Sequence, residues 1–103
     1  MRIAGCIPKR RQNGHVVAPN DAAGQARQVF HNLGEVLKAA GADWRNVVKV
    51  TTYLVDRADA AAVTAARMDI FGEHLPPHTG LIVAGLGEPE VQLEVEVIAV
   101  LPD

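Results

Sequence analysis

The sequence has little of what marks several large classes of protein. It contains one cysteine in 103 residues, so no disulfide can form within the chain and the fold does not depend on an oxidising compartment. No apolar run approaches the roughly 20 residues of a membrane span. The N-terminus also lacks the hydrophobic stretch of a signal peptide. We therefore expect a cytoplasmic protein without a membrane partner.

Aromatic residues and charge of one sign are scarce as well. The formal net charge is -2, and there are one Trp, one Tyr and two Phe. Such a chain has little attraction for a phosphate backbone and little surface for stacking on bases, so its composition does not favour a nucleic-acid partner. The four histidines and the single cysteine lack the spacing of metal ligands, so we expect no bound metal.

Apolar and charged residues are present in ordinary amounts, at 49% and 21% of the chain, as in a globular protein. The length fits one domain over residues 1–103. The pattern of apolar residues and turn signals predicts strands at residues 1–8, 47–55, 78–84 and 91–100, a loop at 9–20, and helices at 21–41 and 59–73. This order predicts an α+β fold with two helices on one face of a mixed sheet.

Spacings of three and four give each predicted helix one buried stripe, with Asp21 and Asp59 as N-caps and Gly41 as the C-cap. The first stripe comprises Ala22, Ala26, Val29, Phe30, Leu33, Val36, Leu37 and Ala40, and the second comprises Ala62, Val63, Ala66, Ile70 and Phe71.

The last predicted strand has two different faces. Val91, Leu93, Val95, Val97 and Ala99 point one way, and Gln92, Glu94, Glu96, Ile98 and Val100 point the other. The second face turns apolar towards its end, and two helices can cover only one face of a sheet. We therefore expect subunits to cover the second face by oligomerisation.

Three segments together resemble the RidA/YjgF family. The segment Gln25 to Leu33, followed by Ala39 to Ala42, is similar to the first helix of that family. Val47 to Asp56 is similar to its central strand, and Leu93 to Val100 to its closing strand. Ala4-Gly5-Cys6-Ile7-Pro8 stands where the family usually has Ser-Gly-Gln-Ile-Pro. The resemblance covers nearly the whole chain, although the family normally has about two dozen further N-terminal residues, which implies either a short member or a misplaced start.

The resemblance implies a chorismate-mutase-like fold, in which three identical protomers form a central barrel with a cleft at each interface. RidA-type enzymes hydrolyse enamines and imines derived from amino acids, releasing ammonia and a 2-keto acid without metal or organic cofactor. The expected partners are therefore two further copies of the chain and a small keto or imino acid.

Two family features are altered at the predicted penultimate strand. The family binds the substrate carboxylate with an arginine in a Pro-x-Arg-Ser/Thr stretch, and this chain has Pro76-Pro77-His78-Thr79 instead. Imidazole is mostly neutral at pH 7 and cannot make the paired hydrogen bonds of a guanidinium. His78 and Thr79 are predicted to bind substrate, with a plain polar strand-edge role for His78 as the alternative. Gly80 stands where many members have a cysteine or serine.

The resemblance places the catalytic water-handling group at Glu94. Glu96 lies on the same strand face, and we expect it to be structural. Gly5 and Cys6, at the family's ligand-facing turn, are predicted to contact substrate, although a lone cysteine is more often inert packing. Arg67 on the second predicted helix is either a replacement for the missing cation or an ordinary exposed helical residue.

Three functions remain open on these residues. The first is a cofactor-free deaminase or hydrolase of imines and enamines, diverged from 2-iminobutanoate/2-iminopropanoate deaminase. The second is a non-catalytic trimer that binds or senses a metabolite. The third, suggested by the endoribonuclease label of some family members, ranks last because the chain has a slight net negative charge.

Overall fold

The structure is a computed structural model that describes residues 2–6 and 21–100. Within them the elements follow the predicted order, and the predicted loop at 9–20 lies outside the described residues. The elements are β1 (Arg2–Cys6), α1 (Ala22–Ala39), β2 (Val47–Leu54), α2 (Ala60–Phe71), β3 (His78–Ile82) and β4 (Leu93–Ala99), with short 3-10 helices η1 (Trp44–Asn46) and η2 (Arg57–Asp59).

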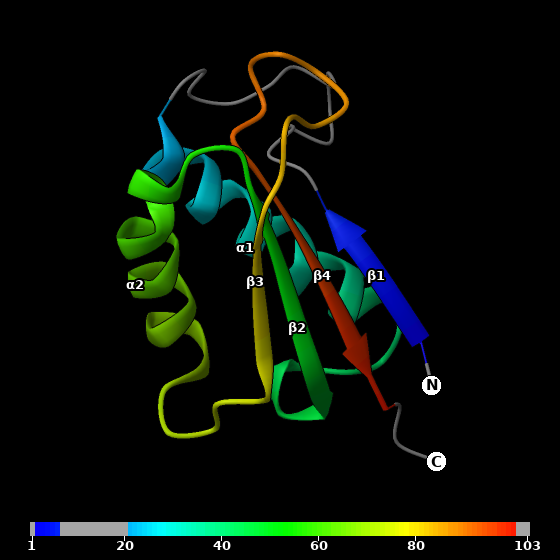
Figure 1. Cartoon of the computed structure of the whole chain (residues 1–103). Helices are drawn as coiled ribbons and strands as arrows, with labels where there is room; N and C mark the ends of the chain where they lie inside the picture. Colours follow the sequence, from blue (N-terminus) through cyan, green and yellow to red (C-terminus); the bar gives the residue numbers. More distant parts are fainter. Residues whose placement is uncertain (1, 7–20, 101–103) are drawn as a thin grey trace.

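The strands form one mixed sheet in the order β1-β4-β2-β3. β4 is antiparallel to both of its neighbours, and β3 runs parallel to β2 at the edge. In Figure 1, α1 passes behind the sheet and α2 stands beside the edge strand β3, so that the near face has no helix over it. The predicted α+β architecture, with two helices on one face, is confirmed. We call the uncovered side the open face.

The two predicted faces of the last strand are also confirmed. Its odd-numbered residues from Val91 to Ala99 are buried, and the even-numbered ones from Gln92 to Ile98 are half-buried. Val50, Thr52 and Leu54 of β2 continue the buried face, because they pair with Val97, Val95 and Leu93. The core therefore lies between the helices and one side of the sheet.

Helix α1 buries its predicted stripe except at its edge. Val29 and Leu33 are fully buried, whereas Val36 is 37% exposed, against the prediction. Val36 lies at the margin of the stripe, about 100° around the helix from Leu37, which is where contact with the sheet ends. The C-cap of α1 is Ala40, one residue before the predicted Gly41. Gly41 follows with a φ of 78°, as a residue just past a helix end often does.

Helix α2 is shorter and less buried than predicted. It ends at Phe71 rather than near Glu73, because the chain turns at Gly72 with a φ of 55°. Val63 and Phe71 are buried, but Ile70 is 38% exposed. The placement of Ile70 in the buried stripe was wrong, because this side chain lies at the groove between the two helices.

The two predicted N-caps lie at the predicted positions, but their side chains do not make the expected hydrogen bonds. Asp21 and Asp59 occupy the N-cap positions of α1 and α2, but neither side chain makes a capping hydrogen bond. Capping is found instead at the 3-10 helices, where Asp43 accepts a hydrogen bond from the backbone N–H of Arg45 at 2.8 Å. A hydrogen bond from the Arg45 guanidinium, together with this backbone bond, lowers the pKa of Asp43.

Gln25 links α1 to the segment that enters β4. Its side chain is fully buried. The amide Nε2 donates to the backbone carbonyl of Glu90 at 2.8 Å, and Oε1 accepts from the backbone N–H of Gln92 at 2.8 Å. Both bonds are shielded from water, where an unpaired amide would be costly. They fix the start of the strand that carries Glu94.

An aromatic cluster joins the two helices near η1. Trp44 packs edge-on against Phe30 at 6.2 Å and Phe71 at 5.3 Å between ring centroids. A Cβ on Gly34 would lie 3.3 Å from Cζ2 of Trp44, so the glycine lets the indole approach α1 closely. Among the described residues, no helix has the length and apolar character needed to cross a bilayer.

Candidate functional site

A pocket lies between α2 and the edge of the sheet, and we call it the α2–β3 pocket. Its volume is about 190 Å³. One face of α2 forms one wall, with positions three and four residues apart, and residues of β2 and β3 form the other. The lining residues are Thr52, Leu54, Arg57, Ala60, Val63, Thr64, Arg67, His78, Gly80, Leu81 and Ile82.

His78 points into this pocket from the helix-facing side of β3. It pairs in register with Val50, which is buried beneath the helices. Its Nε2 lies 2.9 Å from Oγ1 of Thr52 in a hydrogen bond whose donor depends on the ring tautomer. Thr52 is 2% exposed, so this hydrogen bond fixes the half-buried ring to the sheet.

The electrostatic surroundings keep His78 neutral. Burial lowers the pKa of His78 below its ordinary value, and the guanidinium of Arg67 and the ammonium of Lys49 lower it further. An imidazole in this setting offers a carboxylate a single neutral hydrogen bond. His78 therefore does not replace the charge of the family arginine.

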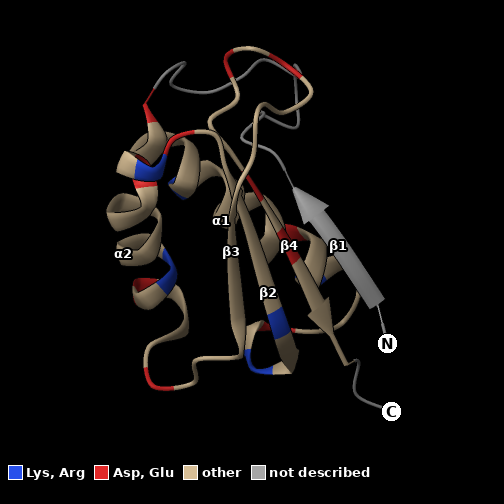
Figure 2. Cartoon of the chain, viewed as in Figure 1, with Lys and Arg blue, Asp and Glu red and all other residues tan. Residues whose placement is uncertain are grey.

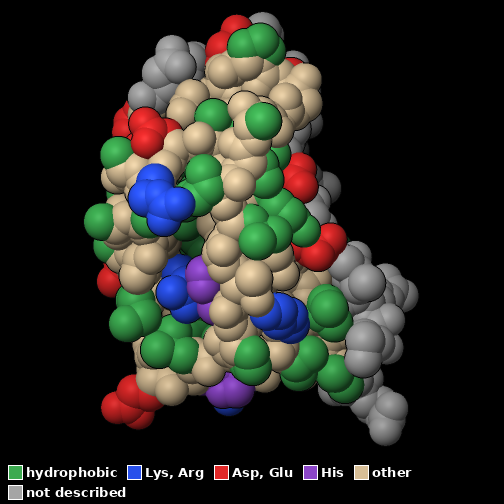
Figure 3. All heavy atoms as spheres, viewed as in Figure 1, with side chains coloured by type: hydrophobic (Ala, Val, Ile, Leu, Met, Phe, Trp, Pro, Cys, Tyr) green, Lys and Arg blue, Asp and Glu red, His purple; other side chains and the backbone are tan. Residues whose placement is uncertain are grey.

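Basic groups dominate the α2–β3 pocket. Arg57 and Arg67 line it, and no Asp or Glu does so among the residues that the structure describes. Figure 2 shows basic positions at η2 and along α2, and in Figure 3 a histidine and a basic side chain lie side by side between α2 and β3. Leu54, Val63 and Ile82 supply apolar wall. The pocket suits a small anion with a short apolar chain.

Gly80 leaves room beside the imidazole. A Cβ at this position would lie 3.4 Å from Cε1 of His78, which is an ordinary contact distance. A side chain here would therefore project into the pocket. With glycine in place, this position brings no nucleophile to the site.

Thr79, the second predicted residue of β3, lies on the open face. It pairs with Thr51 of β2, and its hydroxyl accepts a hydrogen bond from Nζ of Lys49. Adjacent residues of a strand point to opposite faces. His78 and Thr79 therefore contact different sides of the sheet.

Glu94 and Glu96 are neighbours on the open face of β4, in the acidic part of that strand in Figure 2. Both are half-buried, and they pair with Tyr53 and Thr51 of β2. On the other side of β4, the backbone of Gly5 is in register with Glu96. Cys6 is in register with Val95, one residue from Glu94.

The structure thus divides the predicted site residues into two groups. Gly5, Cys6 and Glu94 lie on β1 and β4, whereas His78 and Thr79 lie on β3, with β2 between the groups. The Glu94 side chain is on the open face and that of His78 is on the helix-facing side. One protomer does not bring this carboxylate and this imidazole together.

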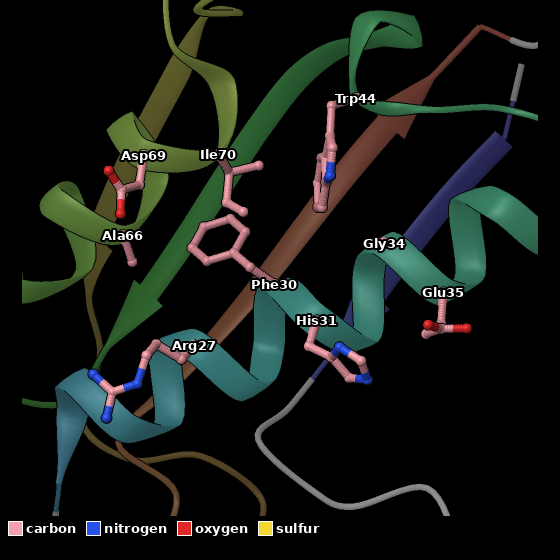
Figure 4. Close-up of a pocket in the computed structure, with 9 residues that line it drawn as sticks. All are labelled: Arg27, Phe30, His31, Gly34, Glu35, Trp44, Ala66, Asp69 and Ile70. Carbon is pink, nitrogen blue, oxygen red and sulfur yellow. The ribbon is translucent and has the colours of Figure 1, made fainter.

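A larger groove lies between the two helices, with a volume of about 390 Å³ (Figure 4). Phe30 and Trp44 contribute aromatic surface, and Arg27, His31, Glu35 and Asp69 surround it. None of the predicted site residues lines this groove. Its charges are of both signs, so it lacks the uniform basic character of the α2–β3 pocket.

Two residues that position the site were missed at the level of sequence. Thr52 was read only as part of a β-branched strand, but its hydroxyl anchors His78. Gln25 interrupts an apolar helical stripe, and that interruption was the available signal. No group of three or more potential metal ligands occurs within the described part of the chain.

Comparison with known proteins shows the family. A family model described as Endoribonuclease L-PSP matches residues 1–101. A RutC family protein of Synechocystis is 37% identical over 99 residues, which span 96% of this chain and 76% of the relative. The chain belongs to the RidA/YjgF family. The 2-iminobutanoate/2-iminopropanoate deaminase of Rattus norvegicus is 39% identical over 98 residues, or 95% of this chain and 70% of that enzyme.

Solved structures of the RidA/YjgF family share the fold. The YjgF gene product of E. coli superposes with a TM-score of 0.84 at 37% identity, covering 95% of this chain and 78% of that one. Yeast Mmf1 superposes with a TM-score of 0.87 at 32% identity, covering 96% and 77%. The expected family and the expected fold of the protomer are therefore both confirmed.

Proposed function

We propose that the chain forms a homotrimer that acts, without cofactor, on small 2-imino acids or related enamines at clefts between its subunits. The observation that carries this proposal is the α2–β3 pocket, which combines cationic groups with apolar wall and has no described carboxylate in its lining. Relatives with 35 to 39% identity are named 2-iminobutanoate/2-iminopropanoate deaminases. A 2-imino acid combines the carboxylate and the short aliphatic chain that such a pocket accommodates.

The need for a subunit interface follows from the two groups of site residues. β1 and β3 are the opposite edges of the sheet. In a closed ring, each protomer presents one surface to the complementary surface of the next. Such contacts bring the β3 side of one protomer towards the β4 and β1 side of its neighbour. His78 and Glu94 then share a cleft without belonging to the same protomer.

Exposed apolar side chains support assembly through the sheet. Leu81 is 44% exposed, Val48 43% and Val100 46%. Figure 3 shows hydrophobic side chains across this face of the molecule, in the view in which Figure 1 shows the uncovered sheet. Covering such side chains with a second copy stabilises an oligomer by about 25 cal/mol per Å² of apolar surface.

In the proposed reaction, the α2–β3 pocket binds the substrate and Glu94 on β4 carries out the proton transfer. The α2–β3 pocket holds the substrate carboxylate, and Glu94 from the neighbouring protomer accepts a proton from water as its oxygen bonds to the imine carbon. A proton from solvent adds to the imine nitrogen as the C=N double bond opens, which gives a carbinolamine. Glu94 then returns its proton to that nitrogen, and the C–N bond breaks as the carbinolamine hydroxyl loses its proton to solvent, so that ammonia leaves and the 2-keto acid remains. Gly5 and Cys6 lie beside β4 at the rim of this cleft.

A second function, binding without turnover, is favoured by one observation. The family resemblance places His78 at the position of the family arginine, and burial with two nearby cations lowers the pKa of His78 below its ordinary value. A site without the strand arginine fits a metabolite-binding trimer as well as a diverged enzyme. The two functions differ in whether bound imine is hydrolysed.

The decisive experiment generates 2-iminobutanoate in place, from an amino acid and an amino-acid oxidase, and measures its hydrolysis. We expect faster release of 2-oxobutanoate and ammonia than with an equal amount of an unrelated protein. A rate equal to that control would remove the deaminase proposal. Sedimentation of the same sample should give a trimer, and a stable monomer at micromolar concentration would remove the interface cleft.

A further inference from the structure

Arg67 lies on the face of α2 that lines the α2–β3 pocket. It follows Val63 by four residues and Thr64 by three, and all three side chains line the pocket. The Arg67 side chain is half-buried. It makes no hydrogen bond or ion pair in the described part of the chain, so its donors are available to a ligand. The long apolar stem of an arginine can pack on a wall while its head reaches a polar partner.

Arg67 and His78 act on the same space from opposite walls. The charge of Arg67 contributes to the lowered pKa of His78, so the two groups are close enough to interact. His78 is held by Thr52 and carries no charge to offer. Any anion in the pocket therefore meets a tethered neutral imidazole on the strand side and a guanidinium on the helix side.

We propose that Arg67 is the carboxylate-binding residue of this protein, so that the cation has moved from strand β3 to helix α2 across one pocket. A guanidinium holds a carboxylate through two parallel charge-assisted hydrogen bonds, whichever wall it comes from. His78 and the Thr64 hydroxyl then complete the polar lining as neutral groups. This inference takes its substrate class from the proposed function and goes beyond it in naming the residue that recognises the acid.

The size of the pocket restricts the acid. Its volume of about 190 Å³ is below the roughly 300–1,000 Å³ typical of pockets for drug-sized ligands. Leu54, Val63 and Ile82 provide apolar wall. A short aliphatic 2-keto or 2-imino acid fits this description.

The test measures binding of 2-oxobutanoate, a stable keto acid, by calorimetric titration of the full-length protein. The variants are Arg67→Gln, His78→Arg and the double variant, with Arg27→Gln on α1 as a matched control outside the pocket. Butan-2-one, which lacks the carboxylate, is titrated in parallel. Thermal unfolding of every variant checks that it is folded. If Arg67→Gln does not fold, Arg67→Lys replaces it in the titration, because lysine keeps the charge and loses the paired hydrogen bonds.

We expect Arg67→Gln to raise the Kd for 2-oxobutanoate at least about tenfold, as for loss of a hydrogen bond between charged groups. Arg67→Lys gives a smaller increase, and Arg27→Gln leaves the Kd unchanged. The double variant recovers most of the lost affinity, because arginine at position 78 returns the cation to the strand wall. The wild type binds butan-2-one at least tenfold more weakly than it binds 2-oxobutanoate. Butan-2-one has the same Kd for Arg67→Gln as for the wild type, because it has no carboxylate for Arg67 to bind.

Three outcomes overturn the assignment. One is a wild-type Kd for 2-oxobutanoate no lower than that for butan-2-one, and another is an unchanged Kd in Arg67→Gln or in Arg67→Lys. The third is a double variant as weak as Arg67→Gln. The proposed function is tested separately. If the wild type binds the keto acid through Arg67 but hydrolyses no imine, the role of Arg67 stands and the deaminase activity is rejected. If Arg67→Gln hydrolyses the imine with an unchanged KM, the deaminase activity stands and the role of Arg67 is rejected.

Discussion

The two faces of the sheet differ in whether helices of the same chain cover them. On the helix-facing side, β2 and β4 present fully buried residues such as Val50 and Leu93, sealed beneath α1 and α2. On the open face the same strands carry Lys49, Glu94 and Glu96, all half-buried, and no helix lies over them. One protomer thus encloses its hydrophobic core and leaves the polar residues of its sheet without a helix over them.

The division of the site follows this difference. The α2–β3 pocket lies at the margin of the covered side, between α2 and the edge strand β3. The carboxylate predicted to handle water lies on the uncovered side. Under the proposed function, the complete site forms only by assembly, so activity is expected to depend on the oligomeric state.

The largest effect is expected on the open face. Glu94→Gln removes the proton acceptor while keeping the shape of the side chain, and should lower kcat/KM for imine hydrolysis by roughly 10²- to 10⁴-fold. Glu96→Gln, two residues away on the same face, should change it by less than about tenfold. Steady-state assays on 2-iminobutanoate compare the two. Equal losses in both variants would assign the water-handling role to the pair, not to Glu94.

The covered face should dominate the stability of the protomer. Leu93 is fully buried and Leu81 is 44% exposed on the open face. Leu93→Ala should lower the free energy of unfolding by about 2–5 kcal/mol through loss of burial and a cavity, and Leu81→Ala by less than about 1 kcal/mol. Urea unfolding at concentrations too low for assembly measures both. A comparable loss for Leu81→Ala would show that the open face is already covered within one chain.

The smallest effect is expected on the pH dependence of stability, through His78 on the edge strand β3. Because the folded-state pKa of His78 lies below the ordinary value of about 6.5, the unfolded chain takes up a proton more readily than the folded one. Stability is therefore retained above about pH 6.5 and falls as the pH drops towards the lowered folded pKa. His78→Gln should lose less stability than the wild type between pH 7 and pH 5 in urea titrations. His74→Gln, at an exposed position, should follow the wild type.

Much of the fold could be predicted because its determinants are local. The alternation in Val91 to Ala99 and the spacing in α1 both report directly which side chains are buried. The errors at Val36 and Ile70 arose at the margins of helical stripes, where burial depends on the neighbouring element and not on the helix itself. The capping roles of Asp43 and Asp56 depend on loop geometry, which spacing alone does not give.

The site was less accessible to prediction. Aligning His78 and Glu94 with a family pattern gives their positions along the chain, but not the face of the sheet to which each points. That information required the register of β2 with β3 and β4. The approach of Arg67 to His78 depends on how α2 is placed over β3, which is a tertiary contact between residues eleven positions apart in different elements.

The side chain of Gln25 bonds to two main-chain groups of the segment before β4, the carbonyl of Glu90 and the amide of Gln92. These two bonds place no demand on which side chains that segment carries. The exposed positions of the connection between β3 and β4 therefore have room to vary, by drift or by design, while these bonds and the buried Val91 keep the strand that follows in register. Grafting alternative sequences into that connection offers a route to new ligand preferences on an unchanged scaffold.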